Sequence, residues 1–423
     1  MDKAAASLLV FVCAYILFVL LPKRRTLIAI AASILLLLAK TLTLKEAFFA
    51  INWNVMGIFV GMLAVANVFM ESRVPAYLAE IIVDKAKNTS WAILLICGLT
   101  SFLSAFLENV ATVLIVAPIA LALAKKIKLN PIKMMIAIAI SSNLQGAATL
   151  IGDPPSMLLG GYAKMNFGDF FFYRSRPSIF FAVELGAIAS FLVLYFIFKK
   201  YKEKTAFIPV EKIKYWTPTI ILLGMIILLA FSSFIDTGFN GLAGIICMVA
   251  GIISLIWEKI INKSSVFGGI KALDWETTFF LFGVFILVGS ITLTGWIDVI
   301  STFLSSLVGD NIFAGYTLLV FVSVIVSAFV DNVPFLATML PVAIAMADKL
   351  HVNPSLFLFG LLIGASLGGN ITPIGASANI VACGLLKKNG YTVKFSEFMK
   401  IGIPFTFVAV TVAYLFVWLI WSK

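Results

Sequence analysis

The sequence predicts an all-α integral membrane protein built from two inverted repeats, each with five transmembrane helices that include a broken helix, together with a re-entrant hairpin. Three observations support this fold class: an apolar composition, motifs that recur at one spacing, and polar interruptions inside apolar segments. Of the 423 residues, 62% are hydrophobic and 12% are charged, which lies outside the range of soluble domains. The lipid bilayer is therefore the expected solvent.

Apolar stretches close to the ~20 residues needed to cross a bilayer recur along the chain. We predict ten crossing segments and four shorter hairpin pieces; clear crossing segments are 4–21, 178–198, 220–234 and 405–421. The first of these is preceded by Lys3 and followed by Lys23, Arg24 and Arg25, which reverses the charge order of a cleavable signal. We expect it to be retained as a membrane helix.

The net charge of +11 is explained by topology and does not require a nucleic-acid partner. If the N-terminus lies outside, most of the 31 basic residues fall on the cytoplasmic side, as the positive-inside rule requires. The basic segments are 23–25, 73–87, 125–133, 199–214, 259–271 and 387–400. We therefore expect a plasma-membrane protein with both termini outside.

Cysteine, histidine and phosphate-binding patterns give no sign of a cofactor. Cys13, Cys97, Cys247 and Cys383 fall singly inside apolar segments, and His351 is the only histidine, so neither a metal-site spacing nor a disulfide framework is present. We expect the cysteines to serve packing. Glycine-rich phosphate loops are missing as well, so the sequence predicts no enzyme, no primary pump and no nucleotide ligand.

The two halves of the chain share motifs at one spacing, on either side of a charged linker at 199–215. Glu108 begins ENVATVLIVAPIALALA, and 223 residues later Asp331 begins DNVPFLATMLPVAIAMA. Because each half contributes five crossing segments, an odd number, the second half must enter the membrane from the opposite face. We place the first repeat at 1–204 and the inverted second repeat at 205–423.

Each repeat contains two interruptions at membrane depth. Two apolar runs separated by an acidic residue and Asn form the predicted re-entrant hairpins at 90–124 and 314–347, and the next segments, 131–160 and 355–386, are broken at 141–156 and 366–379. Unwound backbone persists inside a membrane only where it is buried in protein or lines a polar cavity. Both breaks therefore mark a site. The amphipathic stretches 71–87 and 296–307 are expected to be surface helices.

The four interruptions are expected to meet near mid-membrane and to bind a small ion or ionic solute through backbone dipoles. Glu108 and Asp331 hold equivalent positions, and a buried charge is costly, so we predict that one or both exchange a proton for a cation. The alternative is that each caps the second helix of its hairpin. The other predicted ligands are Asn109, Thr112, Asn143, Gly146, Thr149, Gly152, Asn332, Ser366, Gly369, Asn370, Thr372, Gly375, Ser377 and Asn379.

Two further expectations concern this predicted site. Asn109 and Asn332 are candidate Na⁺ ligands at the hairpin tips, because their side-chain carbonyls suit a hard cation. Asp153 has no acidic counterpart in the second half, where Ala376 stands. We therefore interpret Asp153 as a loop cap and not as a ligand.

Four segments resemble the signature segments of the ion transporter superfamily: ENVATVLIVAP, NLQGAATLIGDPPSMLL, DNVPFLATMLP and LGGNITPIGASANIVACGLLKKNGY. This superfamily includes arsenite efflux permeases, NhaD-type sodium/proton antiporters, the melanosomal P protein and, more distantly, sodium-coupled dicarboxylate carriers. The similarity extends over residues 25–421. It implies a homodimer in which fixed scaffold parts support transport parts that carry the hairpins and broken helices and move as an elevator.

The hairpin tips depart from one branch of that superfamily. In the dicarboxylate carriers each tip has a Ser-Asn-Thr motif that binds sodium and substrate carboxylates, whereas here the matching triplets begin with Glu108 and Asp331 and retain only the Asn. The resemblance thus favours secondary transport of a small inorganic ion coupled to protons or sodium, by cation/proton antiport or arsenite-type efflux. Sodium-coupled uptake of a citrate-like carboxylate is the alternative, and a passive ion channel is a further one.

Overall fold

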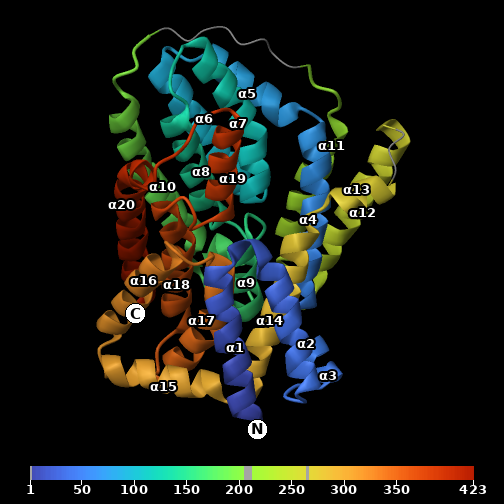
Figure 1. Cartoon of the computed structure of the whole chain (residues 1–423), viewed down its shortest axis with the longest axis vertical. Coiled ribbons are helices and arrows are strands. Elements are labelled where there is room, and N and C mark those ends of the chain that lie inside the picture. Colours follow the sequence, from blue (N-terminus) through green and yellow to red (C-terminus); the bar gives the residue numbers. More distant parts are fainter. Residues whose placement is uncertain (1, 204–211, 263–265) are drawn as a thin grey trace.

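The computed structural model describes residues 2–203, 212–262 and 266–423, and within them the fold is almost entirely helical (Figure 1). The predicted boundary between the repeats at 204 and 205 lies outside the described residues. Eight described helices are long and apolar enough to cross a membrane, which confirms a multi-pass, all-helical protein. They are α1 (Lys3–Leu20), α4 (Trp53–Glu71), α7 (Asn109–Lys126), α10 (Ile179–Phe198), α12 (Leu242–Asn262), α14 (Trp275–Leu293), α18 (Pro354–Gly368) and α20 (Phe395–Trp421).

The remaining elements are shorter, except α17 (Asn332–Lys349) with 18 residues, so length and hydropathy together give fewer spans than the ten predicted. For example, α2 (Arg25–Leu38) has 14 residues and α11 (Thr217–Ser232) has 16, against about 20 for a full crossing. The other helices are α3 (Leu44–Ala50), α5 (Val74–Asp84), α6 (Thr89–Ser104), α8 (Ile132–Gly146), α9 (Pro154–Ala163), α13 (Val266–Ala272), α15 (Trp296–Val308), α16 (Ile312–Ser327), α17 (Asn332–Lys349) and α19 (Ser377–Lys388).

Three single-turn 3-10 helices and one small hairpin complete the described fold. The 3-10 helices are η1 (Pro22–Arg24), η2 (Gly168–Phe170) and η3 (Gly369–Ile371). The strands β1 (Phe172–Tyr173) and β2 (Arg176–Pro177) pair antiparallel, with Phe172 opposite Pro177 and Tyr173 opposite Arg176.

Helices α2, α4, α12 and α14, called here the four-helix group, pack in two pairs: α4 against α12 and α2 against α14. Glycine permits both close crossings. A Cβ atom on Gly61 of α4 would lie 2.2 Å from the backbone carbonyl carbon of Cys247 in α12, and one on Gly283 of α14 would lie 2.9 Å from the backbone carbonyl carbon of Ala29 in α2. Each pair joins a helix of the first half to a helix of the second half.

Helices α6 to α10 and α16 to α20 form the second assembly, called here the hairpin group. Both helices of the first predicted hairpin pack against α8, and both helices of the second pack against α18. The helices after the two breaks cross over between the halves: α9 contacts α17 and α18, while α19 contacts α7 and α8. This exchange brings the two breaks together at the centre of the molecule (Figure 1).

The two predicted surface helices are separate elements. α15 runs crosswise at the lower end of the molecule in Figure 1, and the chain bends by 119° between α15 and α16. Lys349 of α17 holds α15 in place, because its Nζ donates to the carbonyl of Asp298 at 2.9 Å and to Ser301 Oγ at 2.8 Å. The first surface helix begins later than predicted, at Val74, because Glu71 still belongs to α4.

Both breaks are shorter than predicted. Helix α8 continues to Gly146, and α9 starts at Pro154, so residues 141–146 are helical. The polar side chains at this end of α8 do not unwind the helix, because several find partners in neighbouring helices: Ser142 hydrogen-bonds to Ser104. In the second half α18 ends at Gly368 and α19 starts at Ser377.

The cysteines were expected to be packed inside the protein, and the structure agrees for three of the four. Cys97 and Cys247 are buried, and Cys383 is partly buried. Cys13 is exposed on α1, so the packing prediction is wrong for this residue.

Candidate functional site

The first break is tied to the turn of the first hairpin by hydrogen bonds from hydroxyl groups. Thr149 Oγ1 donates to the carbonyl of Ala105, which lies in that turn. Ser156 Oγ donates to the carbonyl of Gly146 at 3.0 Å and thereby closes the break onto the end of α8. These contacts use up the hydroxyl protons of both residues, and they satisfy carbonyls that the unwound backbone would otherwise leave unpaired.

The second break repeats these contacts. Thr372 Oγ1 donates to the carbonyl of Ala328 in the turn of the second hairpin, and Asn379 Nδ2 donates to the carbonyl of Gly369 at 2.9 Å. Each residue stands 223 positions after its counterpart in the first break. The spacing seen in the sequence therefore corresponds to one local structure built twice.

The paired glycines of the breaks are required by close backbone approach. A Cβ atom on Gly152 would lie 2.4 Å from the carbonyl oxygen of Gly146, and one on Gly375 would lie 2.5 Å from that of Gly369. Since real side chains do not approach a carbonyl so closely, only glycine fits at these positions. Their residue type follows from the fold, whether or not their carbonyls bind a ligand.

A buried polar pocket, called here the Asn109 pocket, forms where the first hairpin meets α8. It consists of Ser104, Asn109, Ser142 and Asp153. Ser104 Oγ donates to Asn109 Oδ1 at 2.6 Å and lies 2.8 Å from Ser142 Oγ, which donates to the carbonyl of Asn109 at 3.1 Å. All four residues are less than a tenth exposed.

Asp153 caps α9, as the sequence predicts, but the cap uses only one of its oxygens. Asp153 Oδ1 accepts a hydrogen bond from the backbone N–H of Ser156 at 2.9 Å. Asp153 Oδ2 is buried and has no hydrogen-bond partner. The side-chain amide of Asn109 is near it: a Cβ atom on Gly146 would lie 2.8 Å from Asp153 Oδ2, 2.5 Å from Asn109 Oδ1 and 2.8 Å from Asn109 Nδ2. The pocket thus presents an unpaired carboxylate oxygen.

Glu108 stands at the start of α7, in acidic surroundings. Its side chain accepts a hydrogen bond from the backbone N–H of Ala111 at 2.9 Å, so it caps the helix. Thr112 Oγ1 donates to the carbonyl of Glu108 at 3.2 Å. The carboxylates of Asp153 and Asp274 are near enough to interact electrostatically with Glu108. Within the described residues, no Lys or Arg side chain forms an ion pair with it.

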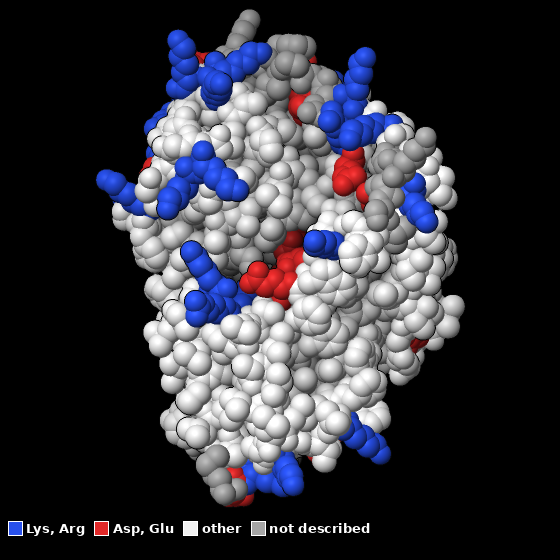
Figure 2. All heavy atoms as spheres, turned by 45° about the vertical axis from the view of Figure 1, so that its right-hand side comes forward, with Lys and Arg blue, Asp and Glu red and all other residues white. Residues whose placement is uncertain are grey.

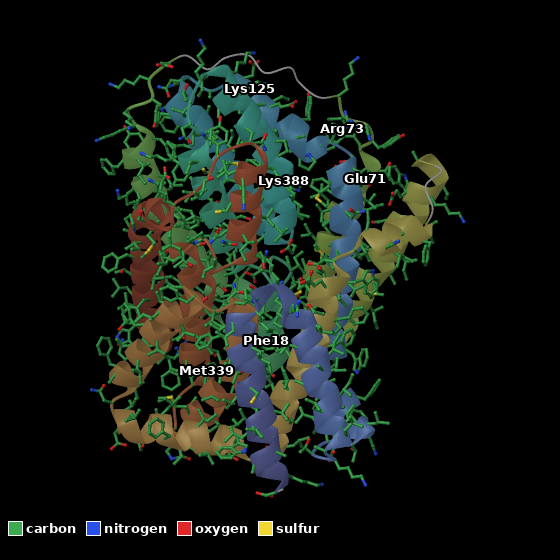
Figure 3. The ribbon with its side chains drawn as sticks, in the orientation of Figure 1. Phe18, Glu71, Arg73, Lys125, Met339 and Lys388 are labelled. Carbon is green, nitrogen blue, oxygen red and sulfur yellow. The ribbon has the colours of Figure 1, made fainter. Side chains whose placement is uncertain are left out.

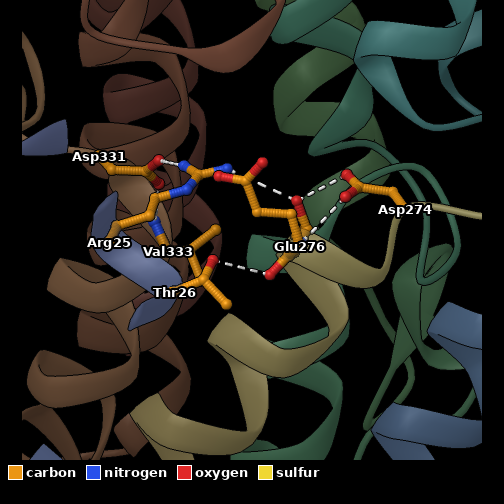
Figure 4. A network of polar contacts seen from close by, with 7 residues as sticks. Arg25, Thr26, Asp274, Glu276, Asp331 and Val333 are labelled. Atoms are coloured by element: carbon orange, nitrogen blue, oxygen red, sulfur yellow. Dashed lines mark hydrogen bonds and ion pairs between the residues drawn. The ribbon is translucent and has the colours of Figure 1, made fainter. Parts of the chain in front are cut away.

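Asp331, the counterpart of Glu108, has a cationic partner. It caps α17 by accepting from the backbone N–H of Val333 at 3.1 Å, and it forms an ion pair with Arg25, the first residue of α2 (Figure 4). The side chains of the pair are 18% and 24% exposed. The two acidic tips therefore occupy different electrostatic environments.

Arg25 is held by the start of α14 as well. Its Nη2 donates to Thr277 Oγ1 at 3.5 Å, and its guanidinium lies 5.0 Å from the ring centre of Phe280. Beside it, Thr26 Oγ1 donates to the carbonyl of Glu276 at 2.9 Å. These contacts fix the guanidinium in front of the second hairpin before any solute binds.

One hydrogen bond joins the two breaks directly. Asn143 Nδ2, at the end of α8, donates to Asn379 Oδ1 of α19 at 2.8 Å, and both residues are buried. The sequence places both residues in the site. The structure brings them together from positions 236 residues apart.

The other predicted ligands fall into two groups. Asn332 and Ser377 are partly exposed, and within the described residues their side chains form no hydrogen bond. Ser366 and Asn370 are buried, with the Ser366 hydroxyl and both amide atoms of Asn370 unpaired. Glu108 and Asp331 are not joined by a hydrogen bond or ion pair in the part of the chain that the structure describes.

Sequence reasoning missed several residues of this region. Ser104 could have been found from the sequence, because Ser327 follows it at the same spacing of 223 residues as the other pairs. In the structure Ser327 Oγ donates to the carbonyl of Ala365 at 2.5 Å. Arg25 could not have been found from the sequence, because it stands in a basic run that membrane topology alone explains. Its role follows only from the three-dimensional contact with Asp331.

The surface shows how charge is distributed around the site. Figure 2 shows acidic side chains in a recess at mid-height, with basic side chains on either side. Lys125, Lys388 and Arg73 lie toward one end of the molecule, and Met339 lies toward the other (Figure 3). A separate cavity of about 790 Å³, lined by residues such as Asn54, Gly161 and Gly244, contains none of the predicted ligands.

One protein-family model matches the chain over two overlapping ranges. The family model described as "Citrate transporter" (CitMHS) matches residues 15–353 and, in a second overlapping match, residues 245–423. The two matches together cover nearly the whole chain.

Similar proteins are found in bacteria and animals. The chain is 30% identical over 432 residues to the 46 kDa membrane protein of Mycobacterium leprae and 28% identical over 425 residues to an uncharacterized transporter, Rv2684, of Mycobacterium tuberculosis, with 98% of each chain covered in both cases. The P protein of Mus musculus is 26% identical over 86% of this chain and 53% of its own length.

Two solved structures share the fold. The YdaH transporter of Alcanivorax borkumensis superposes with a TM-score of 0.61, covering 86% of this chain and 84% of the other, and MtrF of Neisseria gonorrhoeae superposes with a TM-score of 0.56, covering 91% and 84%. Both are 14% identical to this chain. At this identity the likeness concerns the fold alone.

Proposed function

Because the chain belongs to the CitMHS citrate transporter family, we propose that it is a secondary active transporter that couples movement of a small ionic solute to a proton or sodium gradient. This membership, with the similarity to P protein, confirms the resemblance to the ion transporter superfamily. The coupling ion and the solute are what we propose here. The proposal for the coupling ion rests on the Asn109 pocket.

The observation that carries the coupling is the unpaired oxygen of Asp153. A buried carboxylate oxygen without a partner is costly, and a bound proton or cation removes that cost. Oxygen atoms that suit a hard cation occur nearby: Asn109 Oδ1 and Asp153 Oδ2 lie 2.5 and 2.8 Å from a Cβ placed on Gly146, and the carbonyl oxygens of Ser104 and Gly146 lie 3.0 and 2.4 Å from a Cβ placed on Gly152. We assign the coupling cation, Na⁺ or H⁺, to this pocket.

The acidic surroundings favour a solute that is cationic or neutral. Asp153 and Asp274 both interact electrostatically with Glu108, so a free anion approaching these acids would be repelled. Cation/proton antiport and arsenite-type efflux meet this condition and are the leading versions of the proposal. The predicted ligands of the two breaks, which meet at the Asn143–Asn379 hydrogen bond, would bind the solute.

A citrate-like carboxylate is the second candidate, favoured by the description of the family. In this version the carboxylate must arrive with its charge partly neutralised by protons or a metal cation, for the same electrostatic reason.

The mechanism we propose is an elevator in a homodimer of the plasma membrane. The four-helix group would be the fixed scaffold, and the hairpin group would carry the solute between the two faces. The exchange of α9 and α19 between the halves supports this division, because it joins both hairpins and both breaks into one body. The inverted orientation of the repeats would give the two end states equivalent geometry.

Proteoliposomes containing a pH-sensitive dye test the proposal. Sodium, lithium, arsenite, succinate and citrate, the last with and without Mg²⁺, are offered in turn, and we expect at least one to produce proton movement or sodium-dependent uptake against a gradient. Passive movement with unitary currents in planar bilayers would instead establish a channel, and no movement of any probe would refute coupled transport.

The Asp153→Asn variant tests the coupling site. We expect the coupling-ion dependence of uptake to fall at least tenfold, because the amide is neutral and removes the need for a bound cation. Asp169→Asn, a partly buried acid outside the pocket, is the matched control and should retain coupling. Full coupling in Asp153→Asn would remove this pocket from the mechanism.

A further inference from the structure

We infer that the two acidic hairpin tips have different functions: Arg25 neutralises Asp331 and docks the second hairpin onto the turn between α1 and α2, whereas Glu108 is the tip carboxylate that takes up the coupling proton or cation. The inference rests on the proposed function, which it deepens by naming Glu108 as the tip acid that shares the coupling cation with Asp153 of the adjacent Asn109 pocket. It departs from the symmetry of the sequence, in which the two acids are equivalent.

The docking of the second hairpin is built from more than one contact. Besides the ion pair of Arg25 with Asp331, Tyr15 of α1 donates to the carbonyl of Pro334 at 2.7 Å and lies 2.5 Å from Thr338 Oγ1. Both helices of the α1–α2 turn thus bind the first two turns of α17. An acid already paired in this way releases little energy on binding a second cation.

The first hairpin lacks such an anchor. Glu108 is followed directly by Asn109, whose side chain belongs to the Asn109 pocket, it forms no ion pair with a Lys or Arg of the described residues, and the carboxylates of Asp274 and Asp153 interact with it electrostatically. Like charges at short distance cannot all remain ionised at low cost. A proton or cation bound at Glu108 relieves this repulsion, and that gain drives its uptake.

The other ionisable groups around the two tips leave this asymmetry intact. At the second tip they are Asp274, which accepts from Thr277, and Glu276, which Figure 4 shows beside Arg25. Lys23 and Arg24 of the same turn are exposed. Arg73 and Glu80, before and within α5, border a groove with Leu114 and Pro118 of α7, more than one helical turn beyond Glu108.

The first test measures docking without any transported solute. Thermal unfolding of the purified full chain in detergent is followed for Arg25→Gln, Asp331→Asn, the double variant and the charge exchange Arg25→Asp with Asp331→Arg. We expect both single variants to lower the Tm, the double variant to lower it by less than the sum, and the exchange to recover at least half of the loss. Additive shifts with no recovery would refute the docking pair.

The second test measures coupling in proteoliposomes supplied with radiolabelled sodium and radiolabelled citrate. Glu108→Gln should reduce solute-driven proton movement at least tenfold while solute exchange across the membrane continues. The charge exchange at 25 and 331 should recover proton movement that Asp331→Asn loses, and Arg24→Gln, in the same turn, should behave as the wild type. Retained coupling in Glu108→Gln, or lost coupling in a folded charge-exchange variant, would overturn the assignment.

The two tests separate this inference from the proposed function. If wild-type vesicles move neither probe nor protons, the proposed function fails and the assignment of Glu108 fails with it. The Tm measurements still decide the docking pair. If wild-type vesicles are active and only the assignment of Glu108 fails, coupled transport stands, with the coupling cation held by Asp153 in the Asn109 pocket.

Discussion

Asn143 and Asn379 illustrate how single residues hold the site together. Their side chains form a buried hydrogen bond at 2.8 Å, and Asn379 Nδ2 also donates to the carbonyls of Gly369 and Thr372, each at 2.9 Å. The side-chain amide of Asn379 thus pairs with two backbone carbonyls of the second break and joins this break to the first one. Buried polar groups with several partners are costly to remove, because each partner is left unpaired.

Replacement of these asparagines is expected to destabilise the protein in a coupled way. Asn143→Ala should lower the free energy of unfolding by about 1–3 kcal/mol, because it leaves an unpaired buried acceptor, and Asn379→Ala should cost more. The double variant should cost less than the sum of the two. Unfolding of purified protein measures all three, with exposed Asn389→Ala as a control; strict additivity would contradict the contact.

At this scale the sequence predicts the symmetric residues better than the asymmetric ones. Thr149 and Thr372 were found because the same backbone geometry is built twice, so the same hydroxyl is needed twice. The pair of Arg25 and Asp331 joins positions 306 residues apart and has no counterpart in the other half. Asp153 was predicted as a cap, and the structure adds its unpaired second oxygen.

Among the helical elements, the breaks depend on glycine at defined positions. Gly375→Ala places a Cβ atom 2.5 Å from the carbonyl oxygen of Gly369, so the break must open. We expect a loss of about 1–3 kcal/mol in unfolding free energy, as for other overpacked positions, together with loss of transport. Unfolding and flux measurements on the same preparation test both effects.

Gly384 provides the matched control for that prediction. It lies in α19, a few turns after Gly375, and a Cβ atom there meets nothing within 4 Å. Gly384→Ala should therefore be neutral or stabilise the helix by up to about 1 kcal/mol. Equal losses in the two variants would show that the close approach across the break is unimportant.

The close crossing of α4 with α12 leads to a second prediction about helix packing. Gly61→Ala would place a Cβ atom 2.2 Å from backbone of α12, and we expect a loss of about 1–3 kcal/mol in unfolding free energy. Gly224→Ala in α11, where nothing lies within 4 Å, should leave stability unchanged or raise it. Unfolding of both variants in detergent is the measurement, and a neutral Gly61→Ala would refute the crossing.

For the whole molecule, the predicted topology assigns the two ends to opposite sides of the membrane. Lys125 lies at the same end as Arg73 and Lys388 (Figure 3), and this basic end should face the cytoplasm. In a variant with the four native cysteines replaced by serine, Lys125→Cys should react with an impermeant maleimide only from inside. Lys40→Cys, exposed beyond α2, should react only from outside; the reverse pattern would invert the topology.

The overall architecture was more predictable than its internal boundaries. Apolar length and repeated motifs indicate the helices and the hairpins, because both depend on local composition. The ends of the breaks depend on tertiary partners, so the helical state of residues 141–146 could not be inferred from their polar side chains alone. The 14-residue α2 crosses less than a full bilayer thickness, yet its packing on α14 makes it a stable element.

The pairing of α4 with α12 and of α2 with α14 has a consequence for how such a chain can be assembled. Neither half contains the helix that packs against its own glycine, Gly61 of α4 or Gly283 of α14. Residues 1–203 produced alone should therefore be degraded. Co-expression with 212–423 should restore a stable complex without a peptide link. An ancestor with a single repeat would have met the same requirement only as an antiparallel homodimer. Its copies would have inserted into the membrane in both orientations, and copies of opposite orientation would have associated.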